Sequence, residues 1–203
     1  MLTNTHILVA ATALTRQRFT TKQNLAIIAG GVVPDLSVFI MAAVGRMPGS
    51  TITNLWRKPD GMYWQEPWQF FSALSNSIPL YVALLLLFMF LVRRAQKHRA
   101  LWLGSALFFA ACLLHVLFDF PVHADDAHVH FWPLTDARFH SPVSYWQSQY
   151  WGNWVSAFEV IGGLIMATIL WRRFGHWWPR IGTTLLALPY IAAIAFLLRG
   201  FVS

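Results

Sequence analysis

Residues 112–146 read CLLHVLFDFPVHADDAHVHFWPLTDARFHSPVSYW, the end of an apolar helix followed by a polar loop. The helix is predicted to end near Pro121, because proline has no N–H to donate to a helical hydrogen bond. The loop after it holds His123, Asp125, Asp126, His128, His130, Asp136 and His140. Five of the eight histidines and four of the eight acidic residues of the chain lie between His115 and His140. The remainder of the chain is poor in charge, so we expect its chemistry here.

His115 and Asp119 are four residues apart on the predicted helix. This spacing puts both side chains on one face, with Cβ atoms about 5–6 Å apart. Imidazole and carboxylate together suit zinc or a similar divalent ion. An unpaired carboxylate is costly in an apolar segment, so Asp119 needs a partner. The pair predicts a metal site at a membrane surface.

The composition is that of an integral membrane protein. Of the 203 residues, 57% are hydrophobic and 11% are charged, and the apolar runs approach the roughly 20 residues that cross a bilayer. We therefore expect an all-α fold: a polytopic membrane helix bundle forming one domain over residues 1–203. The motifs lie in residues 5–146, and the last two helices are predicted in residues 152–198. The formal charge of +7 then reflects topology, and no nucleic-acid partner is expected.

About five transmembrane helices are predicted from apolar length, at residues 24–44, 77–92, 100–120, 152–171 and 181–198. Residues 1–14 are too short to span, which predicts a re-entrant or half-inserted helix. Ten of the fifteen Lys and Arg residues lie in the linkers 16–22, 93–99 and 172–180, and the positive-inside rule makes these linkers cytoplasmic. The loop 121–151 is then expected on the periplasmic or exterior side of a bacterial inner (plasma) membrane.

Two further residues extend the predicted metal site. Asp35 follows Pro34 inside an apolar span, where it either bonds backbone groups freed by a proline kink or has a functional role. His6 lies in the short first segment, and a lone histidine is more often a hydrogen-bonded structural residue. Because they occur together, we predict that His6, Asp35, His115 and Asp119 converge on a divalent metal, with zinc favoured.

The loop and the neighbouring spans supply the remaining candidates. His123 and His130 are candidate ligands, because the adjacent Phe131-Trp132-Pro133 would hold the loop at the membrane interface. Asp126 and Glu159 are candidate general bases, and Glu159 is also a candidate ligand or histidine partner. The candidate substrate-binding residues are Asn76, Ser77 and Trp132. We expect membrane lipid as a partner and a lipid-linked phosphate as a candidate substrate.

The chain resembles the LexA-regulated, membrane-bound metal-dependent hydrolases. The motifs that carry this resemblance are Thr5-His6-Ile7-Leu8, Pro34-Asp35, Ser75-Asn76-Ser77, and His115-x-x-x-Asp119 followed by Phe131-Trp132-Pro133. They occur in the family's order over residues 5–133. A more distant likeness is to zinc-dependent phospholipases C, which also use an amino-terminal His, an Asp and a helical His-x-x-x-Asp that bridges neighbouring zinc sites. This more distant likeness implies phosphoester hydrolysis.

Two departures from the family pattern affect the number of metals. The Pro-Asp is usually followed by an Asp-His pair, whereas Leu36-Ser37-Val38 follows here, and Asn76 replaces the His of Thr-His-Ser. The extra His and Asp residues of the loop could replace the lost ligands. The leading hypothesis is a hydrolase acting on a lipid phosphoester at the outer leaflet. The alternatives are a metal- or proton-handling membrane protein and a structural membrane protein with a stabilising metal.

Overall fold

The computed structural model describes residues 1–48 and 55–200, and every regular element in these residues is helical. The α-helices are α1 (Thr3–Leu14), α2 (Thr21–Gly30), α3 (Leu36–Val44), α4 (Glu66–Ser75), α5 (Ile78–Arg94), α6 (Arg99–Asp119), α7 (Gly152–Arg173) and α8 (Trp177–Gly200). The short 3-10 helices are η1 (Val33–Asp35), η2 (Met62–Trp64), η3 (Phe120–Val122) and η4 (Ser148–Tyr150). The predicted all-α class is confirmed for the described residues.

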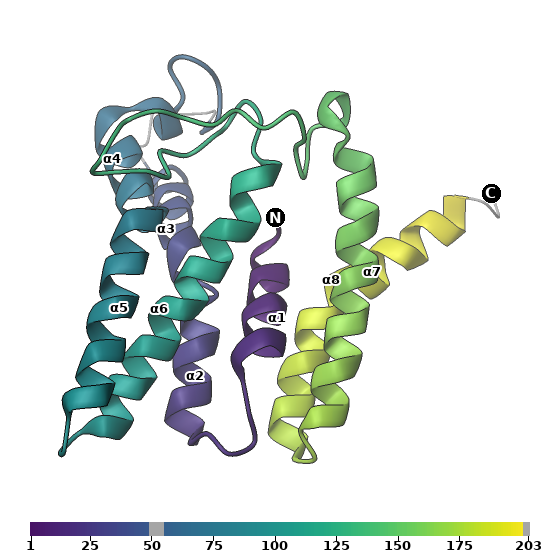
Figure 1. Cartoon of the computed structure of the whole chain (residues 1–203). Coiled ribbons are helices and arrows are strands. Elements are labelled where there is room, and N and C mark those ends of the chain that lie inside the picture. The colour runs from purple at the N-terminus through teal and green to yellow at the C-terminus, as the bar shows by residue number, and fades with distance from the viewer. Residues whose placement is uncertain (49–54, 201–203) are drawn as a thin grey trace.

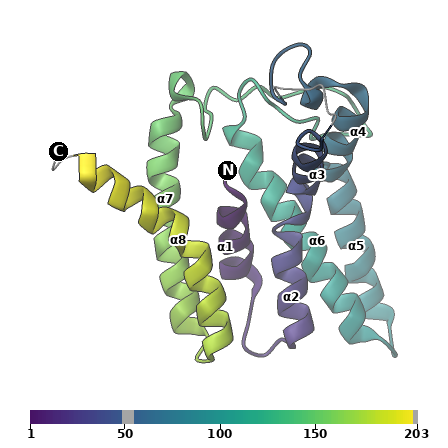
Figure 2. The ribbon, with the colours of Figure 1, turned by 180° about the vertical axis from the view of Figure 1, so that it is seen from behind.

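The helices form two groups with the short helix α1 between them (Figure 1). In one group α6 packs against both α2 and α5, and in the other α7 packs against α8. Helix α1 contacts α2 and α6 on one side and α7 and α8 on the other, as the view from behind also shows (Figure 2). Small residues on α1 allow this close packing: Ala10 meets Ile27 and Ala111, and Ala11 belongs to a cluster with Ala167.

The chain bends by 41° between α2 and α3. Pro34 lies in the 3-10 turn η1 between them and has no N–H to continue the hydrogen bonds of α2. Gly30 ends α2 at a close approach to α6, since a Cβ there would lie 2.3 Å from the backbone oxygen of Phe108. The bend leaves Asp35 at a helix break beside α6.

Three helical stretches are long and apolar enough to cross a membrane: residues 66–94, 99–122 and 152–173. The bent pair Thr21–Gly30 and Val33–Val44 is a fourth candidate if it forms one span. The segment 181–198 is not among these candidates, so the five predicted spans are not confirmed. The expected short amino-terminal helix is present as α1, whose 12 residues measure about 18 Å, well below a bilayer core of roughly 30 Å.

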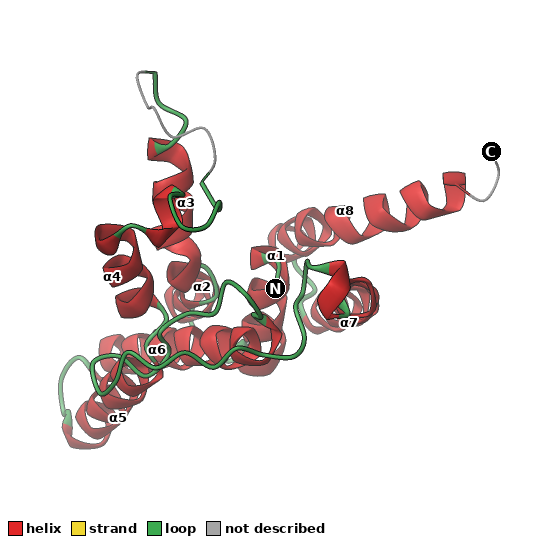
Figure 3. Cartoon of the chain, turned by 90° about the horizontal axis from the view of Figure 1, so that it is seen from above, coloured by secondary structure: helices red, strands yellow, loops and turns green. Residues whose placement is uncertain are grey.

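Helix α8 covers the last span expected at residues 181–198, and it changes direction within that range. Its first half lies beside α7, and its second half turns away from the bundle (Figures 1 and 3). Pro189 lies inside the helix, where it removes one backbone hydrogen bond and its ring clashes with the preceding turn. Proline is therefore the physical reason for the change of direction.

The two ends of the bundle have different chemistry. The three basic linkers, after α1, α5 and α7, lie together at one end (Figure 1). The loop between α6 and α7 lies at the other end and crosses above the helices (Figure 3). The linkers thus share one side, as the distribution of Lys and Arg predicted, and which compartment that side faces stays a prediction.

Candidate metal centre

Helix α6 supplies two central side chains, His115 and Asp119, and both are buried. Nδ1 of His115 lies 2.9 Å from the backbone oxygen of Gly31, and because a carbonyl can only accept, Nδ1 donates. In a neutral ring, Nε2 then carries a free lone pair. This atom faces Oδ2 of Asp119 at 3.4 Å. Metal-binding histidines are usually oriented by a hydrogen bond from the ring nitrogen that does not bind the metal. The Gly31 carbonyl accepts such a bond from His115, and the close approach of α2 to α6 at Gly30 brings this carbonyl to the ring.

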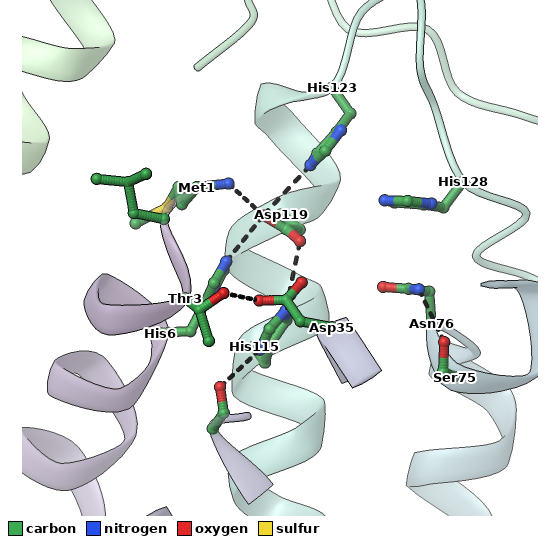
Figure 4. Close-up of polar contacts among 12 residues, drawn as sticks. Met1, Thr3, His6, Asp35, Ser75, Asn76, His115, Asp119, His123 and His128 are labelled. Carbon is green, nitrogen blue, oxygen red and sulfur yellow. Dashed lines mark hydrogen bonds and ion pairs between the residues drawn. The ribbon is translucent and has the colours of Figure 1, made fainter. Parts of the chain in front are cut away.

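Helix α1 adds His6 to this pair. The His6 ring is fully buried and stacks on His115, with ring centroids 3.6 Å apart and an angle of 11° between the planes. Its Nε2 lies 2.9 Å from Oδ1 of Asp119, an oxygen that also contacts the α-amino group of Met1 at 2.6 Å. Ligand atoms of His6, His115 and Asp119 lie within 4.8 Å of one another, so this deep set could hold a metal ion (Figure 4).

Asp35 reaches the deep set from the helix break at η1. Its Oδ1 lies 3.4 Å from Nε2 of His115, and its Oδ2 accepts a hydrogen bond from the hydroxyl of Thr3 (Figure 4). The structure therefore brings together His6, Asp35, His115 and Asp119 from three separate segments of the chain.

A second set of candidate ligands, the shallow set, shares Asp119 with the deep set. Ligand atoms of Asp119, His123 and His128 lie within 4.8 Å of one another, and Nε2 of His123 lies 3.4 Å from Oδ1 of Asp119. Nδ1 of His128 lies 2.9 Å from the hydroxyls of both Tyr63 and Ser72, which leaves its other nitrogen free for a ligand role. Asp119 lies between the two sets, where a carboxylate can bridge two ions.

The charge states of the loop histidines differ. Burial lowers the pKa of His123, but the adjacent carboxylates of Asp119 and Asp126 outweigh this effect and raise the pKa to about 9. Burial and the positive charge of His123 lower the pKa of His128. Burial raises the pKa of Asp126, but His123 outweighs it, and the net shift is downward. At neutral pH a proton on His123 therefore supplies the positive charge between two carboxylates, and His128 is neutral.

The side chains of both sets fit divalent metal ions. Nε2 of His115 and Nε2 of His123 are buried without a hydrogen-bond partner, which is unusual for polar atoms with a purely structural role. Two ligands of one tetrahedral ion, with bonds of about 2.0–2.2 Å, lie about 3.3–3.6 Å apart. The nitrogen–oxygen distances that join His115 to Asp35 and Asp119, and His123 to Asp119, are each 3.4 Å. The spacing is therefore that of ligands around a common ion.

A cavity of about 320 Å³ opens beside the shallow set. The lining residues are Met1, Asp35, Val38, Trp56, Tyr63, Asp119, His123, Asp126, His128, Tyr145 and Trp146. None of these described lining residues is a lysine or arginine. His6 and His115 are not among the lining residues. The deep set therefore reaches the cavity only through the carboxylates of Asp35 and Asp119.

His130 and Glu159, both predicted site residues, lie outside the two sets. His130 is buried, its Nδ1 lies 3.1 Å from the backbone oxygen of Asn76, and its Nε2 has no hydrogen-bond partner. Glu159 lies on α7, and its Oε1 accepts hydrogen bonds from the N–H of Leu2 and the hydroxyl of Thr5. Neither residue lines the cavity.

The three candidate substrate-binding residues also lie away from the cavity wall. The side-chain amide of Asn76 donates to the backbone oxygen of Ser72 at 3.0 Å. The hydroxyl of Ser77 accepts from the N–H of Leu80 at 3.1 Å, which caps α5, and donates to the backbone oxygen of Trp132. These contacts hold the loop against the start of α5.

Sequence reasoning named His128 only as one of the loop residues that could replace a lost ligand, and it did not recognise the partners of His128. His128 lies in a loop with no helical periodicity, so its spacing from Asp119 gave no signal. Tyr63 and Ser72, which hold its ring, come from η2 and α4. Thr3, the partner of Asp35, is three residues before His6 and offered a weak signal as a polar residue in an apolar segment.

No protein-family model matches the chain, and no solved structure matches it. The resemblance to the LexA-regulated hydrolases rests on the order of the short motifs and stays a prediction.

Proposed function

We propose that the protein is an integral membrane metal-dependent hydrolase that cleaves a phosphoester of a lipid or lipid-linked substrate at the outer leaflet. The observation that carries this proposal is the pair of buried His/Asp sets that share Asp119. They lie at the end of a helix long and apolar enough to cross a membrane. Two neighbouring ions suit phosphoester cleavage, because they stabilise both the attacking and the leaving oxygen.

Each set has a distinct part in this proposal. Bound divalent ions, with zinc favoured by the His/Asp chemistry, supply hydroxide at neutral pH and polarise a phosphoryl oxygen. His6, His115 and Asp119, with Asp35 beside them, hold the deep position, and Asp119, His123 and His128 hold the shallow position next to the cavity. No lysine or arginine lines the cavity among the described residues, so a phosphate there finds positive charge at these positions and at the α-amino group of Met1.

Asp126 is the proposed general base. It lines the cavity, and its Oδ2 lies 3.1 Å from Nδ1 of His123 and accepts a hydrogen bond from the indole N–H of Trp146 at 3.1 Å. These contacts orient the carboxylate, and its lowered pKa keeps it ionised at neutral pH. Glu159 is a weaker candidate because its carboxylate is engaged by α1.

A lipid substrate is favoured by the surface beside the cavity. Val38 of α3 lines the cavity, whereas its neighbours Leu36, Phe39 and Ile40 are exposed. Exposed apolar side chains on a membrane helix contact acyl chains. A lipid can therefore place its phosphate in the cavity and keep its tails against α3, which is the arrangement expected for a lipid phosphoesterase.

A metal- or proton-handling protein is the alternative. A conducting path needs polar side chains that continue from the site toward the basic linkers. One turn before His115, however, Ala111 packs with Ala10 and Ile27 in a buried apolar cluster. This packing favours hydrolysis over conduction.

The experiment that tests the proposal is phosphate release from a panel of lipid phosphates and phospholipids by the purified protein in detergent. We expect turnover that a chelator removes and added Zn²⁺ restores. Asp126→Asn should lose turnover but keep its metal, because Asp126 is not a member of either ligand set. A metal-replete wild type that cleaves none of the panel, and only loses thermal stability with chelator, would support a structural metal instead.

A further inference from the structure

Helix α1 carries His6, yet its own sequence does little to satisfy its ends. The N-cap residue, Leu2, provides no side-chain hydrogen bond, and the helix has no acidic residue in its first turn and no basic residue in its last. The first N–H groups and last C=O groups of a helix have no partner within the helix. Such groups are costly to leave unpaired at membrane depth. At the carboxyl end Thr15 donates its backbone N–H and its hydroxyl to the backbone oxygen of Ala11. Further partners at both ends come from α7.

Glu159 of α7 binds the amino-terminal end of α1. Its Oε1 accepts hydrogen bonds from the backbone N–H of Leu2 at 2.7 Å and from the hydroxyl of Thr5. Because the Thr5 hydroxyl donates to Glu159, the hydroxyl of Tyr190 on α8, 2.5 Å away, donates to Thr5. Glu159 is buried, and Thr5 directly precedes His6. The contact therefore lies next to a candidate ligand.

Arg173, at the end of α7, binds the other end of α1. Its Nη1 lies 3.2, 2.8 and 3.0 Å from the backbone oxygens of Ala11, Thr12 and Thr15. Fourteen residues separate Glu159 from Arg173, about 21 Å along the helix, which is close to the length of α1. The two helices run in the same direction (Figure 1). A negative charge thus lies at the amino end of α1 and a positive charge at its carboxyl end, the arrangement that complements the helix dipole.

We propose that Glu159 and Arg173 are positioning residues that fix α1 along its axis and so hold His6 against Asp119. A shift of α1 by one residue moves His6 by about 1.5 Å, whereas metal–ligand bonds tolerate about 0.2 Å. The inference rests on the metal site of the proposed function, but it does not require that the protein hydrolyse anything.

This role differs from a general base in what the variants do. A general base acts on water, so its loss lowers turnover and leaves metal binding intact. A positioning residue acts through His6, so its loss changes the affinity and geometry of the deep set. Loss of a residue that only stabilises the fold lowers the melting temperature and changes neither the metal affinity nor the ligand geometry.

The test measures binding of Co²⁺ to the full-length protein in detergent, because the visible absorption of Co²⁺ reports the geometry of its ligands. For Glu159→Gln we expect Co²⁺ binding weaker by about 10- to 100-fold and an altered spectrum, at a temperature where the variant is folded. Thr5→Val should act in the same way, and Thr5→Ser, which keeps the hydroxyl, should restore the wild-type spectrum. Wild-type affinity and spectrum in Glu159→Gln and Thr5→Val would overturn the proposal.

Arg173→Gln tests the other end of α1, with Arg172→Gln as the matched control. Arg172 is exposed and is the preceding residue of the same helix. We expect weaker Co²⁺ binding in Arg173→Gln only, and equal effects in both variants would contradict the proposal. A wild type that binds no Co²⁺ would overturn the metal site and this inference together. Co²⁺ binding that the variants weaken, without cleavage of any lipid phosphate, would overturn only the hydrolase.

Discussion

Nε2 of His115 lies 3.4 Å from Oδ2 of Asp119, one turn further along α6. This distance is long for a hydrogen bond, and in the neutral ring the hydrogen is on Nδ1, which donates to Gly31. If the ring is neutral, two lone-pair groups face each other in a buried place. A cation between them, either a proton on Nε2 or a metal ion, removes the repulsion, and the separation is the one expected for two ligands of one tetrahedral ion.

Asp119→Asn tests the residue that the two sets share. The amide keeps the size of the side chain and removes its charge, so both sets lose a ligand. We expect the metal content per chain to fall for both positions, measured by elemental analysis of the purified protein. The variant should still insert into the membrane, because a neutral amide costs less than a carboxylate in an apolar segment. Full metal content would contradict the ligand assignment.

His6→Gln and His128→Gln separate the two sets. Each replaces a ligand of one set only, so we expect each variant to lose one metal position and keep the other. His140→Gln is the control, because this exposed histidine belongs to neither set. Metal titration with Co²⁺ gives the stoichiometry of the three variants. If His128→Gln bound as much metal as the control, the shallow set would not be a metal site.

The sequence predicted those parts of the site that helical periodicity and apolar length determine. His115 and Asp119 share a face because they are four residues apart, and Asp35 was singled out because a carboxylate is rare in an apolar span. The common side of the three basic linkers followed from charge alone. Each of these predictions depends on local spacing or on composition, which the sequence displays directly.

Long-range contacts explain what the sequence did not reveal. His128 reaches Asp119 through the course of an irregular loop, and Tyr63 and Ser72 hold its ring from distant segments. Glu159 has the charge and depth of a functional residue, but only the packing of α7 on α1 shows its partners. The direction of α8 depends on Pro189, which a hydropathy pattern over residues 181–198 does not register.

Gly30→Ala tests the close approach of α2 to α6. The added Cβ would lie 2.3 Å from the backbone oxygen of Phe108, so the helices must separate and carry the Gly31 carbonyl away from His115. We expect a loss of about 1–3 kcal/mol in the free energy of unfolding, measured by denaturation in detergent, and weaker metal binding. Gly162→Ala is the control, since its Cβ meets nothing within 4 Å. Equal stability of the two variants would contradict this packing.

The orientation in the membrane is tested by labelling single cysteines. Asp136→Cys lies in the loop that carries the His and Asp residues, and Gln96→Cys lies in a basic linker; both positions are exposed. From the positive-inside rule we expect a membrane-impermeant thiol reagent to label Asp136→Cys in intact cells and Gln96→Cys only after permeabilisation. The native Cys112 is buried and should give little background. The reverse pattern would place the cavity on the cytoplasmic side.

The pH dependence of metal binding tests the charge state of His123. Burial lowers its pKa, but Asp119 and Asp126 outweigh burial and raise the pKa to about 9, so the free ring is protonated at neutral pH. A metal ligand must be neutral, and binding therefore displaces this proton. Below pH 9 the apparent affinity for Zn²⁺ at the shallow set should rise by about tenfold per pH unit for this one proton, and the rise should level off above pH 9.

Calorimetry in two buffers of different ionisation enthalpy counts the protons released, and we expect at least one per chain at pH 7. In His123→Asn the apparent affinity for Zn²⁺ should rise less steeply with pH, because this variant has no proton at position 123 to release. An equally steep titration in this variant would show that His123 is not a ligand.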